Sequence, residues 1–200
     1  GLCSDFKHNS RFASFVLVSK GSYQYELDIQ YPFALVAPGK DGSSKISIIP
    51  AWWFMYDMFA ITRNKNKFLK RDKRVKKIQY IETDPLAPDT MQEIMIALDR
   101  LIGLTAGYLK SIDSEYMENK TTHEEQYQAA KDFLHQNSEA EFTLEDPICQ
   151  KKFGAVIYKP VQAYKIYRKI VKYFATRTLM DFCQSLNQEM LTLDLVERIR

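Results

Sequence analysis

Hydrophobic and polar residues alternate along the first quarter of the chain. Residues 23–29 show this most clearly, with tyrosine, leucine and isoleucine at odd positions and polar or acidic residues between them. A period of two is typical of a β-strand with one buried face. Apolar, β-rich runs at residues 12–19, 31–37 and 45–49 are separated by glycine- and serine-containing turns. The pattern predicts four short strands that form a small sheet or part of a barrel wall.

The most apolar stretch of the chain follows at residues 51–62, where Asp57 is the only charged residue. Pro50 precedes it, and proline suits the first turn of a helix. A helix that is apolar on every side is normally enclosed by protein, and this one is too short to cross a bilayer. The stretch therefore predicts a central core helix.

The rest of the chain has apolar residues at spacings of three and four, which is typical of helices. We expect helical structure at residues 68–82, with Val75, Ile78 and Ile81 facing inward. A Thr90–Glu93 capping box predicts a second helix that extends to Ile112, and a Thr122–Glu125 capping box predicts a third. Two more helices are expected, one beginning at Pro160 and one around residues 190–199. The acidic run 138–147 predicts a loop, and the segment around Ala155 is the one later strand candidate. The predicted fold class is α+β, mainly α: a β portion (1–49) and a helical domain (50–200) with about five helices.

Composition narrows the class of protein. The 200 residues are 46% hydrophobic and 26% charged with a net charge of +3, which suits one water-soluble domain with a real core. Three widely spaced cysteines form no C-x-x-C motif, which argues against a zinc site and favours a reducing compartment. We therefore expect a cytoplasmic protein with no membrane segment, metal or cofactor. The chain begins without methionine and ends within a helical pattern, so we expect it to be part of a longer protein.

Motifs for nucleotide loops, serine nucleophiles and zinc helices are not found in the sequence. Asp57 is the one carboxylate in the apolar stretch, and its helical neighbours Ala60 and Ile61 are apolar. A buried carboxylate needs a partner. We predict a structural ion pair or hydrogen bond with a distant side chain, whose loss in Asp57→Ala would cost about 3 kcal/mol.

A basic segment covers residues 63–77, with nine lysines and arginines against one acid, Asp72. Such a run is typical of a solvated face, but it also attracts phosphate groups. Because no nucleic-acid motif accompanies it, nucleic-acid binding is disfavoured. We expect the acidic residues of the 138–147 run to dock on this basic segment and balance its charge: Glu139, Glu141, Glu145 and Asp146. If that run does not dock, Arg71 and Arg74 would be free to hold a phosphate from one helical face.

Four sequence blocks resemble an uncharacterised family of long bacterial proteins: H-N-S-R-F-A-S-F (8–15), L-D-I-Q-Y-P-F-A-L-V (27–36), P-A-W-W-F-M-Y-D-M (50–58) and R-D-K-R-V-K-K-I-Q (71–79). Members of that family have an N-terminal left-handed β-helix of hexapeptide type and a helical C-terminal part. The resemblance covers about the first 85 residues and implies that residues 2–49 are the last coils or the cap of the β-helix. Proteins with such a β-helix are often labelled sugar-phosphate nucleotidyltransferases or acyltransferases by similarity.

Two functions follow from this resemblance. The first is a non-catalytic helical module for packing, oligomerisation or partner binding, attached to the preceding β-helix domain of the same chain. The second is a fragment of a transferase that binds a sugar phosphate or sugar nucleotide. In that case the phosphate would be held by a set of polar and basic residues: His8, Asn9, Arg11, Arg63, Arg71 and Arg74.

Overall fold

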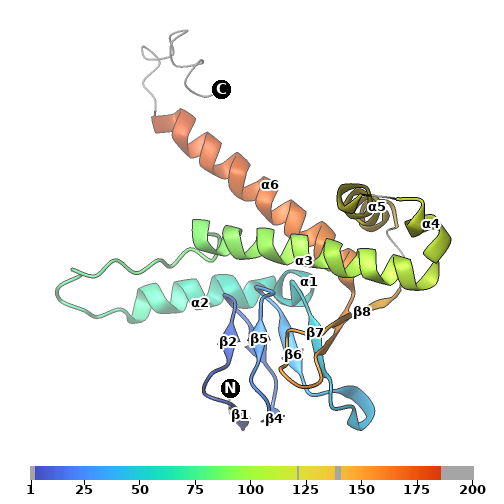
Figure 1. Ribbon diagram of the computed structural model, residues 1–200. Helices are drawn as coiled ribbons and strands as arrows, with labels where there is room; N and C mark the ends of the chain where they lie inside the picture. Colours follow the sequence, from blue (N-terminus) through green and yellow to red (C-terminus); the bar gives the residue numbers. More distant parts are fainter. Residues whose placement is uncertain (1–2, 121, 138–140, 186–200) are drawn as a thin grey trace.

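The computed structural model describes residues 3–120, 122–137 and 141–185. It confirms a mixed α and β chain in which the strands come mostly first and the remainder is mostly helical. Figure 1 shows the helices gathered along one side of the β portion, with the last helix extending away from both. The strands are β1 (Ser4–Phe6), β2 (Arg11–Phe12), β3 (Leu17–Val18), β4 (Gly21–Tyr23), β5 (Asp28–Ile29), β6 (Leu35–Ala37), β7 (Ile46–Ile49), β8 (Thr143–Asp146) and β9 (Ala155–Tyr158).

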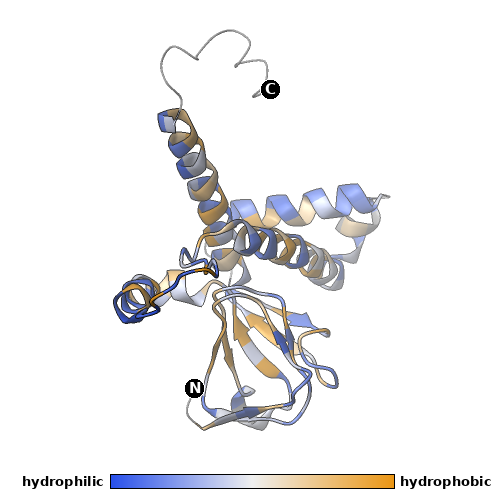
Figure 2. Cartoon of the chain, turned by 90° about the vertical axis from the view of Figure 1, so that its left-hand side faces the viewer, coloured by the Kyte–Doolittle hydropathy of each residue, from blue (hydrophilic) through white to orange (hydrophobic). Residues whose placement is uncertain are grey.

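The first six strands wind through two turns, which we call the β-coil (residues 4–37). Each strand of the first turn pairs in parallel with a strand of the second: Ser4 lies opposite Gly21, Arg11 opposite Asp28, and Leu17 opposite Leu35. Partners are therefore 17, 17 and 18 residues apart along the chain. Figure 2 shows that the β portion has a roughly triangular outline in this view.

The predicted inward face of residues 23–29 is largely confirmed, since Tyr23, Leu27 and Ile29 are buried. The segment is not one strand, however, because β4 ends at Tyr23 and β5 begins at Asp28. The chain turns a corner between them. A period of two persists through such a corner, so the sequence pattern alone does not show it.

Later strands cover the second turn of the β-coil. β6 pairs antiparallel with β7, β7 pairs in parallel with β9, and β9 pairs antiparallel with β8. The strand predicted around Ala155 is thus confirmed. The loop predicted at 138–147 is wrong in part, because residues 143–146 form β8 on the edge of this sheet. Within the described residues, β1, β2 and β3 of the first turn each have one strand partner only.

The helices are α1 (Trp52–Tyr56), α2 (Met58–Arg71), α3 (Pro88–Ile112), α4 (Ser114–Glu118), α5 (His123–Gln136) and α6 (Pro160–Ser185). Three sequence predictions are confirmed: the end at Ile112, the Thr122–Glu125 capping box and the start at Pro160. The Thr90–Glu93 capping box is wrong. The N-cap of α3 is Ala87, three residues before Thr90, and the Glu93 carboxylate accepts a hydrogen bond from the backbone N–H of Ser14 at 2.8 Å. The helix predicted around 190–199 lies outside the described residues.

The central core helix predicted at 51–62 is also wrong. The chain breaks at Asp57 into α1 and α2, and none of the α1 residues is fully buried. Phe59 is 73% exposed. The most deeply buried helix is α3, whose stripe includes Ile94, Ala97 and Leu101. An apolar run shows only that its residues are hydrophobic. Burial also requires neighbouring elements on every side. Here α2 extends away from the core, so several of its apolar residues remain exposed.

The helix predicted at 68–82 ends at Arg71 and is followed by an irregular segment up to Ala87. Val75 and Ile78 were predicted to face inward, but they are 99% and 89% exposed. A short helix gains most of its stability from packing. The side chains of Val75, Ile78 and Ile81 (the last 40% exposed) are left largely uncovered by the described part of the chain, so this part of the segment lacks the packing that a short helix needs. No helix in the described ranges has both the length and the apolar character needed to cross a membrane.

A buried ion pair joins the β portion to the helical layer. The guanidinium of Arg100 on α3 donates to both carboxylate oxygens of Asp146 on β8, and the hydroxyl of Tyr31 donates to the same carboxylate at 2.7 Å. The Asp146 side chain is fully buried. Burial alone would raise its pKa, but these hydrogen bonds outweigh burial and hold the pKa below its ordinary value.

A second buried link runs from α6 to the β-coil. The hydroxyl of Tyr167 donates to the carbonyl of Pro32 at 2.6 Å and accepts from the backbone N–H of Ala51 at 3.2 Å. Ala51 has a left-handed backbone with φ of 53°. The Tyr167 hydroxyl therefore satisfies two backbone groups at the point where the strands give way to the helices.

We expect Asp146→Ala to lower the free energy of unfolding by about 3–5 kcal/mol, because it leaves the largely buried Arg100 without its carboxylate. Glu145→Ala is the matched control: its exposed ion pair with Lys45 should contribute less than about 1 kcal/mol. Urea denaturation at pH 7 measures both. A loss below about 1 kcal/mol in Asp146→Ala would contradict the role of the ion pair.

The same pair makes a pH prediction. Because the pKa of Asp146 is lower in the folded state, its contribution is fully present above the unfolded value of about 4 and is lost as the pH falls through the folded value. Between about pH 5 and pH 2, Asp146→Ala should therefore lose less stability than the native chain. If the free energy of unfolding changed by the same amount in both proteins over this pH range, the prediction would be contradicted.

Tyr167→Phe should cost about 1–3 kcal/mol, because the carbonyl of Pro32 and the N–H of Ala51 would both remain buried without their partner. The control Tyr173→Phe changes an exposed hydroxyl on the same helix and should stay within about 0.5 kcal/mol of the native chain. Thermal and urea unfolding measure the difference. Equal stabilities of the two variants would refute the structural role of the Tyr167 hydroxyl.

Candidate functional site

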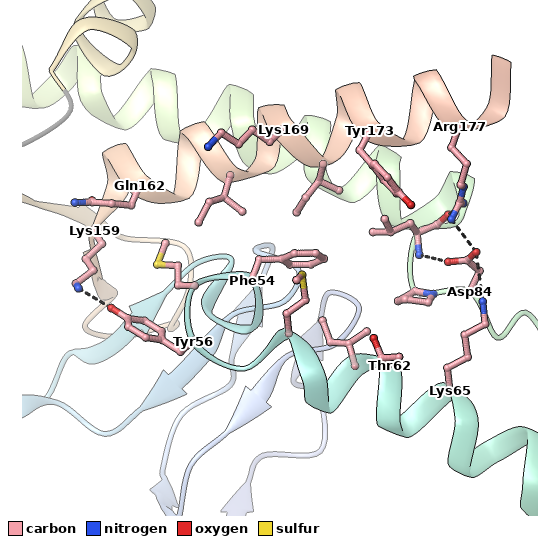
Figure 3. Close-up of a pocket in the computed structure, with 17 residues that line it drawn as sticks. Phe54, Tyr56, Thr62, Lys65, Asp84, Lys159, Gln162, Lys169, Tyr173 and Arg177 are labelled. Carbon is pink, nitrogen blue, oxygen red and sulfur yellow. Dashed lines mark hydrogen bonds and ion pairs between the residues drawn. The ribbon is translucent and has the colours of Figure 1, made fainter. Parts of the chain in front are cut away.

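A groove of about 1020 Å³ lies between two walls of helix. α1 and the start of α2 form one wall, α6 forms the other, and the segment 84–86 before α3 closes one end. Figure 3 shows the side chains of these elements pointing toward one another across the groove. Its size is within the usual range for a small-molecule site.

The floor of the groove is apolar. Ile166 and Ile170 come from successive turns of α6, four residues apart, and therefore share one face of that helix. The opposite wall is built from residues of the apolar run that the sequence predicted to be fully buried, including Phe54 and Met58. Phe54 packs edge-on against the buried ring of Phe33, with ring centroids 4.9 Å apart, which fixes this wall on the β-coil.

One end of the groove is polar and has one carboxylate for two cations. Arg177 of α6 lies 3.1 Å from the carboxylate of Asp84 and also donates to the carbonyl of Leu86 at 3.0 Å. The ammonium of Lys65 on α2 is 3.6 Å from the same carboxylate. Asp84 thus holds α2, α6 and the segment before α3 together, and it offsets one of the two positive charges that it contacts.

Two lysines ten residues apart along the chain, Lys159 and Lys169, line the rest of the groove. The Lys159 ammonium donates to the hydroxyl of Tyr56 at 2.5 Å, and this hydrogen bond raises the pKa of Lys159. The carboxylate of Glu141 is close enough to Lys159 to contribute to its raised pKa. Lys169 also lines the groove, and no ion pair involves it within the described residues. The side-chain oxygen of Gln162, another lining residue, is buried with no hydrogen-bond partner there. Asp84, at the far end, is the one acidic residue among the described lining residues.

The residues predicted to hold a phosphate are exposed and lie on separate elements: His8 and Asn9 between β1 and β2, Arg11 in β2, Arg63 and Arg71 on α2, and Arg74 beyond its end. No hydrogen bond or ion pair joins the first three to the last three within the described residues. Arg74 is engaged by its neighbour Asp72, with Nε and Nη2 at 2.7 and 2.8 Å from the two carboxylate oxygens. Arg71 and Arg74 therefore do not form the pair on one helical face that the sequence suggested.

The acidic run does not supply the counter-charge of the basic segment. Glu145 pairs with Lys45, Asp146 pairs with Arg100, and Glu139 lies outside the described residues. The basic segment is compensated locally instead. Asp72 contacts Arg74 and Lys77, and Asp84 contacts Lys65. The predicted docking of the 138–147 run on the basic segment is therefore wrong, because residues closer in sequence provide the negative charges.

Asp57 is not a buried ion pair. It is half-buried and forms the N-cap of α2, where its carboxylate accepts a hydrogen bond from the backbone N–H of Ala60 at 3.3 Å. No ion pair involves it in the described part of the chain. Aspartate is among the preferred N-cap residues, and the break between α1 and α2 provides the free N–H groups that it caps.

The buried cluster around Asp146 is unsuited to nucleophilic chemistry. Burial, together with the neighbouring Asp146 carboxylate, raises the pKa of the Cys149 thiol far above its ordinary value. Burial likewise raises that of Tyr31. Both groups therefore stay neutral at physiological pH, and thiolate is the reactive form of cysteine. The described residues hold no group of three or more metal-ligating side chains.

Sequence reasoning missed the polar residues of the groove. In the sequence, Lys169 and Arg177 lie on the basic face of the helix that begins at Pro160, and nothing distinguishes them from Lys165 or Lys172 on that face. The apolar neighbours at Ile166 and Ile170 were the available signal, since they place Lys169 beside an apolar stripe. The position of α2 opposite that stripe could not be inferred.

The chain is similar to a protein of Treponema pallidum (strain Nichols) described as an uncharacterized protein. The two are 36% identical over 186 residues, which cover 91% of this chain and 24% of the Treponema protein. The chain thus spans about a quarter of the length of that relative. No protein-family model matches the chain. No solved structure matches it either.

Replacing Asp57 should have the modest effect of losing an N-cap. We expect Asp57→Ala to lower the free energy of unfolding by about 1 kcal/mol, well below the roughly 3 kcal/mol of a broken buried ion pair. Asp57→Ser keeps a capping oxygen and should stay within about 0.5 kcal/mol of the native chain. Urea denaturation of the three proteins measures this. Equal losses in both variants would show that the carboxylate does more than cap the helix.

Proposed function

We propose that this chain is a non-catalytic structural module that ends a stack of parallel β-coils and lays helices along its side. The register of the β-coil carries this proposal. Parallel partners 17 or 18 residues apart correspond to a coil with three sides of about six residues, which is the repeat of a hexapeptide β-helix. In this proposal residues 1–49 are the last coils or the cap of such a β-helix, in line with the family resemblance.

The two ends of the β-coil differ in a way that supports a direction of stacking. The second turn is covered on two of its three sides: β6 pairs with β7, the N–H of Asp28 donates to the carbonyl of Cys149 at 3.1 Å, and Leu27 forms a bridge with Gln150. The first turn offers the outer edges of β1, β2 and β3. In proteins, the edge of a strand is normally paired with another strand or covered by other parts of the chain. A preceding coil of the same protein would pair with them in the same parallel register.

The arm formed by α2 and the segment after it supports the same arrangement. Figure 1 shows this arm extending past β2 on the side of the first turn. Its large apolar side chains are exposed, and they include Phe59, Leu69, Val75, Ile78 and Tyr80. Several large apolar side chains exposed on one arm of the chain are a candidate interaction surface. We propose that these residues pack on the side of the preceding coils.

Two further observations fit this module. The Treponema relative is about four times as long as the region of similarity, which leaves room in that protein for further coils. Cys3, Cys149 and Cys183 are all free, which suits a reducing compartment such as the cytoplasm. The separate positions of the predicted phosphate residues favour the module over a transferase fragment.

The structure of the full-length Treponema relative tests the proposal. We expect the strands equivalent to β1, β2 and β3 each to gain a second parallel partner from residues 17 or 18 positions earlier. Amide hydrogen exchange provides a second measurement, because the outer amides of these strands should be protected in the long protein and exchange rapidly in this chain. Edges that stay solvent-exposed, or that pair antiparallel, would refute the stacking.

Calorimetric titration tests the non-catalytic part of the proposal. We expect no heat from sugar phosphates or nucleoside diphosphate sugars at about 100 μM protein, a concentration at which millimolar affinity begins to be measurable. Arg71→Ala/Arg74→Ala is the matched variant. Binding to the native chain that disappears in this variant would support a sugar-phosphate site and overturn the proposal.

A further inference from the structure

One corner of the chain recurs every 18 residues. Phe15, Phe33 and Ala51 all have a left-handed backbone, with φ of 59°, 57° and 53°. Residues other than glycine take this conformation uncommonly, and asparagine and aspartate are the main exceptions. Three such residues at a constant spacing, two of them phenylalanine, therefore mark a repeated corner.

The rings at this corner form a column that is open at one end. The rings of Phe15 and Phe33 stack with their centroids 5.0 Å apart and their planes within 5° of parallel. Phe33 is completely buried, whereas Phe15 is 44% exposed. Beyond Phe33 the column stops, because Ala51 has no ring and Phe54 of α1 packs edge-on against Phe33. Further stacking is possible only on Phe15.

The backbone hydrogen bonds of the corner end at the same place. The N–H of Phe33 donates to the carbonyl of Ser14 at 2.9 Å and so links the first corner to the second. At the third corner the equivalent groups are the N–H of Ala51 and the carbonyl of Pro32. Both bond to the hydroxyl of Tyr167 instead of to each other. A helix side chain thus takes the place of the direct link and closes this end of the column.

The first corner is held in position but is incomplete. The N–H of Ser14 donates to Glu93 of α3 at 2.8 Å, and the carbonyl of Phe15 accepts the indole N–H of Trp53 at 2.8 Å. The N–H of Phe15, which corresponds to that of Phe33, has no hydrogen-bond partner in the part of the chain that the structure describes. The helical layer therefore fixes this corner and leaves one backbone donor and one ring face for a further coil.

We propose that this corner receives an aromatic residue of the preceding coil, 18 positions before Phe15 and in the same left-handed conformation. Its ring stacks on Phe15, and the carbonyl of the residue before it accepts the Phe15 N–H, as Ser14 does for Phe33. The inference rests on the proposed stacking of coils and names the side chain that the open corner selects. A shared backbone conformation directs the side chains of successive corners the same way, so the rings meet face to face.

The residues that most readily take a left-handed backbone would not complete the column. Glycine and asparagine adopt it at the lowest cost. Neither covers the face of a phenylalanine ring, whereas a second aromatic ring stacks on it favourably. Phenylalanine occupies this corner twice in the chain, although its backbone preference is unfavourable. Ring stacking therefore determines the residue at this corner.

The structure of the full-length Treponema relative tests the inference at the corner itself. The residue 18 positions before the equivalent of Phe15 should be phenylalanine, tyrosine or tryptophan. Its φ should be about 50–70°, and its ring centroid should lie about 4.5–7 Å from the next ring of the column.

The same structure separates this inference from the proposed function. A further parallel coil with glycine, asparagine or an aliphatic residue at the corner would overturn the aromatic partner and leave the stacking of coils in place. Strands without a further parallel partner would overturn both.

Hydrogen exchange of this chain by itself provides a baseline. The amide of Phe15 should exchange at least about 100-fold faster than that of Phe33, because only the second has a partner and a buried ring. Equal protection of the two amides would show that the first corner is already complete, which would overturn the inference.

Substitution in the full-length relative assigns the contact to the ring. Alanine at the preceding corner should speed exchange of the amide equivalent to that of Phe15 by at least about 10-fold, while another aromatic residue should keep it within about 2-fold. Alanine at the equivalent of Phe6 is the matched control. Phe6 is 48% exposed on the same turn but meets Phe12 edge-on outside the column, so this amide should be unaffected. Equal effects of the two alanine substitutions, in proteins with native circular dichroism, would overturn the proposal.

Discussion

The buried ion pair between Arg100 and Asp146 is the interaction on which the arrangement of this chain depends. It joins the central helix α3 to the edge strand β8, and the hydroxyl of Tyr31 adds the β-coil to the same point. Removing two charges from water is costly, and the cost is offset only when every hydrogen-bonding site on the carboxylate is satisfied. Here Arg100, Tyr31 and the backbone N–H of Ile148 satisfy it. The pair therefore forms only when helix, strand and coil are all in place.

The same ion pair is linked to the way β8, β9 and the segment between them lie against the second turn of the β-coil. Asp146 reaches Arg100 because β8 pairs with β9, and β9 pairs with β7 next to the second turn. The segment between β8 and β9 brings Cys149 and Gln150 against that same turn. Among the described residues, the strands of the first turn gain no partner beyond the second turn, and the helices reach this turn at Ser14 and Phe15. The asymmetry is the physical basis for proposing that the chain ends a longer stack.

Charge in the helical layer is compensated over short distances, and this determines what the surface can bind. Asp72 and Asp84 between them contact Lys65, Arg74, Lys77 and Arg177. The densely basic segment is therefore less available to a phosphate than its composition indicates. Lys169 has no ion-pair partner within the described residues, although the sequence around it looks ordinary. Local pairing, rather than the local number of cations, distinguishes the candidate site.

The sequence alone determined those features that depend on neighbours within about one helical turn. The end of α3 at Ile112, the Thr122 capping box, the start of α6 at Pro160 and the strand at Ala155 are all of this kind. Tertiary structure decided the rest. Whether Phe59 is buried depends on what lies opposite, and Asp146 meets Arg100 and Tyr31 across 46 and 115 residues. Asp57 became a cap because α1 and α2 separate at that residue. Hydrophobicity and charge are properties of single residues, whereas burial and pairing are properties of positions, and only the folded chain assigns positions to distant residues.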